Sequence, residues 1–146
     1  GLGEHRQAAD LHQQVLTDRQ RILGPDHPHT LNSRNNQALA LNGLGEHRQA
    51  ADLHQQVLTD RQRILGPDHP DTLTSRNNQA LALSDLGEHR QAADLLQQVV
   101  SDSERILGPD HPDTLNSRNN LAHARARAAQ AGRRRWWQRG RRSGGT

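Results

Sequence analysis

The sequence predicts an all-α protein, an α-solenoid of antiparallel helix pairs, and three observations carry this prediction. The chain of 146 residues repeats itself with a period of 42 residues. Each copy holds two segments whose apolar residues recur at the spacing of an amphipathic helix. The segments are joined by short loops, which make consecutive helices antiparallel. Copies of this kind are stable because each one packs on its neighbours.

The repeat is nearly perfect, which a recent tandem duplication explains. A third copy begins at residue 85 and stays in the same register to about Ala124. The first two copies, residues 1–42 and 43–84, differ at three pairs of positions only: His29/Asp71, Asn32/Thr74 and Asn42/Ser84. Such duplication indicates a stacked array, because only stacking gives every copy the same surroundings.

Six helices are expected, two in each copy, over residues 4–23, 29–42, 46–65, 71–84, 88–107 and 113–129. The longer helix of a copy collects its apolar residues on one arc and Arg, Gln and Asp on the opposite arc. It ends at Gly66-Pro67 in the second copy, since glycine accepts the left-handed cap and proline cannot continue a helix. The shorter helix begins after Asp68-His69-Pro70-Asp71, where an Asp or a His side chain can cap it and proline suits the first turn.

Composition excludes several kinds of chemistry. The chain has no Cys, which excludes disulfides, thiol nucleophiles and Cys-ligated metal sites. All 19 basic residues are Arg, so there is neither a P-loop lysine nor a Schiff-base lysine. No apolar stretch approaches the roughly 20 residues that cross a bilayer. We expect a cytoplasmic protein and, because the chain starts with Gly and lacks Met, a processed piece or a fragment.

The titratable residues offer no candidate catalytic or metal site. Carboxylates such as Glu46, Asp52 and Asp60 are expected at helix starts or on the solvated outer face. The ten histidines recur because the repeat does, and their spacings complete no known set of metal ligands. We expect His47 to pack at a turn between helices and His69 to cap a helix. The sequence therefore predicts a protein that is not an enzyme and binds no metal or cofactor.

One run of residues in each copy resembles a known family. Leu-Gly-Pro-Asp-His-Pro-Asp-Thr stands at residues 65–72 and 107–114, and at residues 23–30 with His29 in place of the second Asp. Together with the period of 42 and the segment Asn35-Asn36-x-Ala38, this resembles tetratricopeptide repeats of the kinesin-light-chain type. The resemblance covers residues 1–130 and implies three tandem helix-turn-helix repeats wound into a right-handed superhelix.

Three departures from the family's pattern suggest a thin core. Gln37 and Gln79 occupy a position where the family usually has Leu, which returns at Leu121. His54 replaces a usual apolar residue, which returns at Leu96. Aromatic residues are missing from all three copies. We therefore expect modest stability, because little apolar surface is buried in each repeat.

The shorter helices carry the candidate binding residues. In the family the corresponding face lines a concave groove, where Asn side chains hydrogen-bond the backbone of an extended peptide. A carboxamide both donates and accepts, so it can satisfy a peptide unit whatever the ligand's side chains. The alternative is that these Asn side chains solvate a polar face or bridge neighbouring helices. The candidate groove residues are Asn32, Asn35, Asn36, Leu39, Asn77, Asn78, Leu81, Asn116, Asn119 and Asn120.

The C-terminal tail differs in charge from the repeats. Residues 1–124 hold 11 Arg and 16 acidic residues, whereas residues 125–146 hold 8 Arg and no acidic residue. Arg suits phosphate and Trp suits base stacking or a membrane interface. Residues 131–146 are expected to be a solvated disordered end, a cap whose Trp rings cover the last repeat, or the product of a shifted reading frame. The candidate tail residues are Arg133, Arg134, Arg135, Trp136, Trp137 and Arg139.

These patterns predict a non-catalytic protein–protein interaction scaffold that binds an extended peptide or a partner domain in its concave groove. The high Arg and Ala content suggests a GC-rich bacterial genome, and the resemblance implies a fragment of a larger bacterial signalling or regulatory protein. The alternative is nucleic-acid or anionic-surface binding through the basic tail. Self-association through the open ends of the solenoid is a third hypothesis.

Overall fold

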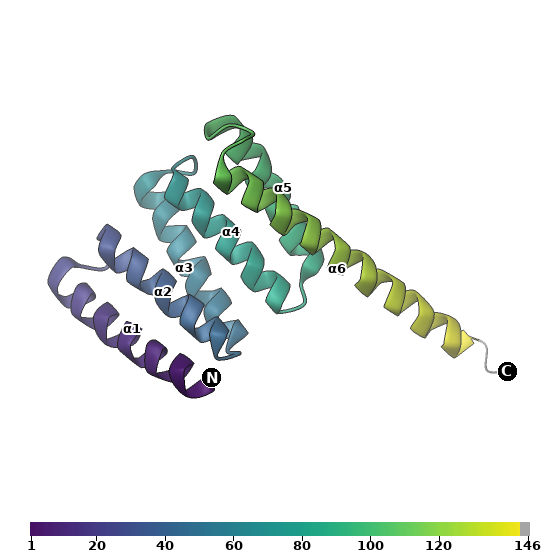
Figure 1. Cartoon of the computed structure of the whole chain (residues 1–146), viewed down its shortest axis with the longest axis horizontal. Coiled ribbons are helices and arrows are strands. Elements are labelled where there is room, and N and C mark those ends of the chain that lie inside the picture. The colour runs from purple at the N-terminus through teal and green to yellow at the C-terminus, as the bar shows by residue number, and fades with distance from the viewer. Residues whose placement is uncertain (144–146) are drawn as a thin grey trace.

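The computed structural model describes residues 1–143, in which six helices follow one another without a strand (Figure 1). This confirms the prediction of an all-α repeat array. Each helix packs mainly against the helices that precede and follow it in the chain. The helices are α1 (Leu2–Leu23), α2 (Pro28–Gly43), α3 (His47–Leu65), α4 (Pro70–Asp85), α5 (His89–Ile106) and α6 (Pro112–Ser143).

The helix ends follow from the residues that recur at each boundary. His69 is the N-cap of α4, and its Nδ1 accepts a hydrogen bond from the backbone N–H of Asp71 at 3.1 Å. His27 caps α2 in the same way, with Pro28 in the first turn. The longer helices end next to a glycine of positive φ, such as Gly66 at 88°, a conformation that residues with a Cβ rarely adopt. The predicted histidine cap and the glycine at the end of the long helix are confirmed, but with ψ at 165° Gly66 does not adopt the left-handed helical conformation that was expected.

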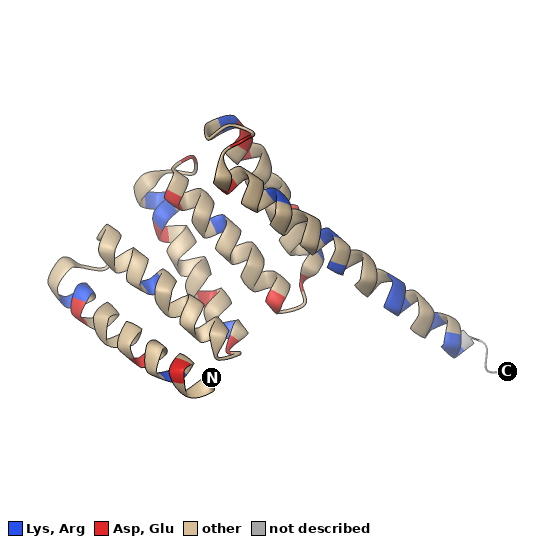
Figure 2. Cartoon of the chain, in the orientation of Figure 1, with Lys and Arg blue, Asp and Glu red and all other residues tan. Residues whose placement is uncertain are grey.

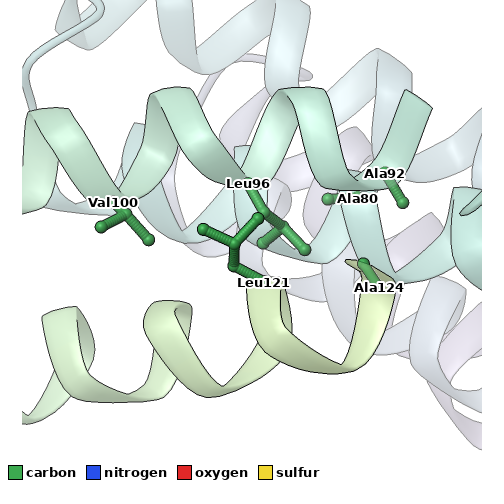
Figure 3. Close-up of a cluster of buried hydrophobic side chains, with 6 residues drawn as sticks. All are labelled: Ala80, Ala92, Leu96, Val100, Leu121 and Ala124. Atoms are coloured by element: carbon green, nitrogen blue, oxygen red, sulfur yellow. The ribbon is translucent and has the colours of Figure 1, made fainter. Parts of the chain in front are cut away.

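A cluster of buried apolar side chains lies between α4, α5 and α6 (Figure 3). Leu96 is fully buried there, in the place where the preceding repeat has His54. Small residues make up much of the rest, so the core is thin, as expected from the missing aromatics. The buried apolar cluster consists of Ala80, Ala92, Leu96, Val100, Leu121 and Ala124.

Two glutamines lie where the family usually has leucine. Gln37 and Gln79 are only 7% and 8% exposed. Neither Oε1 atom has a hydrogen-bond partner among the residues that the structure describes. A buried amide oxygen without a donor costs free energy, because it has lost its bonds to water. Both glutamines are thus buried at positions where the family usually has an apolar side chain.

Ion pairs join successive repeats. Arg34 on α2 contacts Asp60 on α3 at 2.5 Å, and Arg76 on α4 contacts Asp102 on α5 at the same distance. The hydrogen bond from Arg76 lowers the pKa of Asp102. The expectation that Asp60 lies on the solvated outer face was wrong. Its side chain is partly buried because the stacking of α3 on α2 brings it against the guanidinium of Arg34.

The last helix is longer than the sequence indicated. The predicted end lies at residue 129, but α6 continues to Ser143 and projects beyond the other helices (Figure 1). Residues 131–143 therefore differ from the disordered end or cap that was expected of the tail; residues 144–146 lie outside the described part of the chain. Ala, Arg and Gln favour helix, and no proline interrupts this stretch.

Candidate functional site

The asparagines of α2, α4 and α6 form a ladder across the repeats. The Nδ2 atom of Asn78 donates to Oδ1 of Asn35 at 2.9 Å. The Nδ2 atom of Asn120 donates to Oδ1 of Asn77 at 3.2 Å. Both bonds join residues 43 positions apart, so each connects one repeat to the next. Four of the candidate groove residues thus bridge neighbouring helices, which was the alternative interpretation of their pattern.

The ladder leaves hydrogen-bonding groups for a ligand. A carboxamide has two N–H groups and an oxygen with two lone pairs, and the bridge uses one N–H of Asn78. Its Oδ1 and its second N–H can still bind a peptide unit. Asn36, Asn116 and Asn119 are exposed. Bridging also fixes the orientation of the amides, which lowers the entropy lost when a ligand binds.

Asn32 is engaged by a residue that the sequence did not single out. Arg61, on α3, donates from Nη2 to Oδ1 of Asn32 at 2.6 Å and from Nη1 to Oγ of Ser75 at 2.9 Å. Nη1 also donates to the backbone oxygen of Asp71 at 3.3 Å. The guanidinium is buried, and this desolvation lowers the pKa of Arg61. In the sequence only the exchange of Arg61 for Ser103 in the third copy distinguishes this position.

A cavity of about 370 Å³ opens between the C-terminal halves of α2 and α4 and the N-terminal half of α6. Leu39 and Leu81, two candidate groove residues, lie at its rim and are 51% and 38% exposed. Asn78 and Asn120 of the ladder also line it, so the amides and an apolar pocket share one surface. His54 and Leu96 contribute from α3 and α5, and the remaining lining residues are Asn42, Ala82, Ser84, Asp85, His123, Ala124 and Arg127.

His54 is the unusual residue of this cavity. It is 4% exposed, and its Nδ1 has no hydrogen-bond partner within residues 1–143. Burial lowers the pKa of His54 from 6.5 to about 4, because the charged imidazolium would lose its hydration. The side chain is therefore neutral near pH 7. Its side chain occupies the position that Leu96 occupies in the next repeat. Unlike leucine, histidine carries polar ring nitrogens.

The basic tail lies on the projecting part of α6 (Figure 2). The side chains of Arg133, Arg134, Arg135 and Arg139 are exposed there. Trp136 and Trp137 are 69% and 62% exposed and contact each other edge to face, with ring centroids 5.4 Å apart. Their exposure shows that the rings do not cover the last repeat. The described chain has no acidic residue after Asp113, and this half of α6 is therefore uniformly basic.

The N-terminal face of α1 is apolar and open. Leu2, Leu11 and Ile22 are 72%, 60% and 66% exposed. Leu44 and Leu53, which hold the positions of Leu2 and Leu11 in the second repeat, are partly buried. The difference arises because α3 packs against α2, whereas no described helix precedes α1.

The described residues contain neither a cluster of metal-ligating side chains nor a helix that could span a membrane. No group of three or more His, Cys, Asp or Glu side chains that could hold a metal ion occurs within residues 1–143. Over the same range, none of the helices combines the length and the apolar character that crossing a membrane requires.

Comparisons with known proteins identify relatives of the repeats. The sequence profile described as tetratricopeptide repeat matches residues 1–63 and 36–104. The chain is similar to nearly identical tetratricopeptide-like repeats, seen in a crystal structure, of a protein of Podosopora anserina assigned as a kinesin light chain. The identity is 30% and the TM-score 0.80, and the match covers 90% of this chain and 62% of that one.

A second solved structure shares the fold at lower identity. BtubC from P. vanneervenii matches with a TM-score of 0.77 and 17% identity, over 87% of this chain and 51% of that chain. No curated protein sequence matches the chain. The chain thus spans between half and two thirds of the length of these solved structures.

Proposed function

Because the chain belongs to the tetratricopeptide repeat family, whose repeats generally mediate protein–protein interactions, we propose that it is a non-catalytic scaffold that binds an extended peptide in its concave groove. In this proposal residues 1–130 form the interaction array and residues 131–146 a separate basic tail. The array is part of a larger bacterial signalling or regulatory protein in the cytoplasm.

The observation that carries the proposal is the shared surface of the ladder and the 370 Å³ cavity. The ladder offers donors and acceptors at regular intervals, which suits the regular backbone of an extended peptide. The cavity beside Asn78 and Asn120 offers room for one apolar side chain of that peptide. Backbone recognition would supply affinity, and the cavity would supply selectivity.

Selection from a library of displayed random peptides tests this proposal, followed by fluorescence anisotropy with the selected peptide. Substitution of Asn36, Asn78 and Asn120 by Ala should weaken binding at least tenfold, since each lost hydrogen bond contributes about 0.5–1.5 kcal/mol. Gln55→Ala with Gln56→Ala is the matched control, because both glutamines are exposed on α3. Weaker binding in the control, with full binding in the Asn variant, would place the ligand on the convex face instead.

A second candidate function rests on the projecting half of α6. Its exposed arginines and paired Trp rings suit a polyanion such as a nucleic acid, since Arg binds phosphate and indole stacks on bases. Salt separates the two functions. Binding through phosphates should weaken steeply as salt increases, whereas groove binding through neutral amides should change little.

Self-association is a separate proposal and concerns the open face of α1. Its exposed Leu2 and Leu11 side chains correspond to Leu44 and Leu53, which are partly buried in the second repeat. Stacking of another copy on this face would be head-to-tail and would lead to open assemblies. Sedimentation velocity of the wild type and of Leu11→Glu, over a range of concentrations, tests this proposal. A sedimentation coefficient that rises with concentration in the wild type only would support stacking. Monomeric sedimentation of both proteins at every concentration would oppose it.

A further inference from the structure

The repeat contains a socket for a guanidinium group, and the chain fills it twice with its own side chains. Arg19 donates from Nη1 to Oγ of Ser33 at 2.7 Å and to the backbone oxygen of His29 at 3.1 Å. These contacts correspond, atom for atom, to those that Arg61 makes in the second repeat with Ser75 and Asp71. One serine hydroxyl and one backbone carbonyl therefore define the socket.

The third repeat has the socket without the arginine. Ser103 stands 42 positions after Arg61, and its single-carbon side chain cannot span the same distance. A cavity of about 120 Å³ lies at this place, between α4, α5 and the start of α6. Ser103 and Ser117 are buried, at 2% and 5% exposure. Six residues that line this 120 Å³ cavity are the counterparts, one repeat later, of residues that line the cavity around Arg61. They are Pro70, Leu73, Thr74, Ser103, Leu107 and Asp113.

The polar groups of this cavity suit a cation with several N–H donors. Ser117 holds the position of Ser75, and its hydroxyl can accept as Ser75 does. Thr74 replaces Asn32 and donates its own hydroxyl proton to the backbone oxygen of Pro70 at 3.1 Å, a bond that leaves the lone pairs of Oγ1 unused. Asn77 and Asn78 also line the cavity and add carboxamide groups.

The mouth of the cavity carries a negative charge. Asp113 is exposed and holds the position of Asp71. In the second repeat the carboxylate of Asp71 acts to raise the pKa of Arg61, against the effect of burial. The third repeat keeps this carboxylate although its own cation is missing. A cation from another molecule would meet the same attraction there.

We propose that the cavity beside Ser103 binds the guanidinium group of an arginine side chain supplied by a peptide ligand. Lysine would bind more weakly, because its compact ammonium lacks the planar fork that the socket accommodates in Arg19 and Arg61. Asn78 lines both this cavity and the 370 Å³ cavity, so one extended peptide can reach both. The inference rests on the proposed function in one respect: the arginine that supplies the guanidinium belongs to a peptide bound in the groove.

The direct test uses methylguanidine as the probe and methylammonium as its control, with binding followed by NMR on the full chain. We expect methylguanidine, at concentrations far below those that denature proteins, to shift the backbone amide of Ser117 and the side-chain amide of Asn78. Methylammonium should bind at least about fivefold more weakly, because it cannot donate in a fork. Equal responses to the two cations would overturn the inference.

Matched variants locate the probe. Ser103→Arg fills the socket from within, as Arg61 does one repeat earlier, and should abolish methylguanidine binding while raising the melting temperature. Arg61→Ser should create a second methylguanidine site and lower the melting temperature. Asp113→Asn, which leaves the buried groups in place, should weaken binding. Undiminished binding in Ser103→Arg, or in Asp113→Asn if the former does not fold, would contradict the assignment.

A pair of peptides separates this inference from the proposed function. The peptides are alanine-rich, capped at both ends, and differ in one central Arg or Lys. Binding of the Arg peptide alone supports both proposals. Binding of methylguanidine without binding of either peptide would support the guanidinium site. It would refute the proposal that a peptide supplies the guanidinium group. Equal binding of both peptides would support the groove and oppose selection of arginine.

Discussion

The side-chain amide of Asn78 donates to the side-chain oxygen of Asn35 at 2.9 Å, across the boundary between the second and the first repeat. Asn120 repeats this contact with Asn77. The same amides that are candidates for binding a peptide therefore also hold successive repeats together. A substitution in the ladder changes two properties at once, and the predictions below separate them.

The ladder should contribute to stability only where it bridges. Asn78→Ala removes a bridging hydrogen bond and should lower the free energy of unfolding by about 0.5–1.5 kcal/mol. Asn36→Ala, at an exposed position in the first repeat, should change it by less than about 0.5 kcal/mol. Urea unfolding followed by circular dichroism measures both values. Equal losses would mean that the Asn35–Asn78 bond contributes nothing to stability.

Replacing the buried glutamines should stabilise the array. Gln37→Leu and Gln79→Leu each remove a buried amide oxygen without a partner and add apolar contact, for a gain of about 1 kcal/mol or more. The melting temperature should rise with each substitution. Leu121→Gln, at the matching position of the third repeat, is the reverse experiment and should lower it. A fall in melting temperature for both Leu variants would show that the amides are satisfied in solution.

Acid should destabilise the protein through His54. The pKa of His54 is about 4 in the folded protein, against 6.5 for the free side chain. The unfolded state therefore binds the proton more tightly. The stability that comes from neutral His54 is complete above about pH 6.5 and is lost as the pH falls toward 4. The expected slope in that window is at most about 1.4 kcal/mol per pH unit.

The matched variant for this pH dependence is His54→Leu, which copies the third repeat. The difference in unfolding free energy between variant and wild type should grow as the pH falls from 7 to 5. Urea titrations at the two values measure it. A difference that stays constant would show that His54 is accessible to protons in the folded state. Other titrating groups cancel in the comparison, because both proteins share them.

Removal of the basic arm should abolish binding to polyanions. A chain cut after Ala131 keeps 13 Arg against 16 acidic residues, and such a body has no net field to hold a polyanion at physiological salt. Retention on heparin measures this, and binding of a selected groove peptide should be unaffected. Retention of the shortened chain at the same salt would assign polyanion binding to the repeats.

Tryptophan fluorescence provides an independent measurement on the arm. Trp136 and Trp137 are the only Trp residues, and both are mostly exposed. The emission maximum of the free protein should therefore be red-shifted, as for water-exposed tryptophan, and iodide should quench the emission easily. A shift on adding RNA or DNA would support the second candidate function. Emission that is already blue and salt-insensitive would mean that the rings pack on the last repeat in solution.

The fold could be predicted from the sequence because its causes are local and occur three times. Helical spacing of apolar residues, Gly66 after a long helix and His69 before a short one act within a few residues of each boundary. Their threefold recurrence removes the ambiguity of a single pattern. The length of α6 was less predictable, since the register of the repeat is lost after Ala124 and exposed Arg and Ala give no signal for a stop.

The sequence by itself determined the period, the helices with their caps, and the face of the short helices on which the asparagines gather. Only the tertiary structure decided which residues meet across repeats. Arg34 hydrogen-bonds to Asp60, at a sequence separation of 26 residues, and Asn78 to Asn35, at a separation of 43 residues. These separations depend on how far one helix pair is rotated and shifted against the next, and side-chain packing at the interface sets that offset. For the same reason Arg61 on α3 is buried, in contact with residues of α2 and α4.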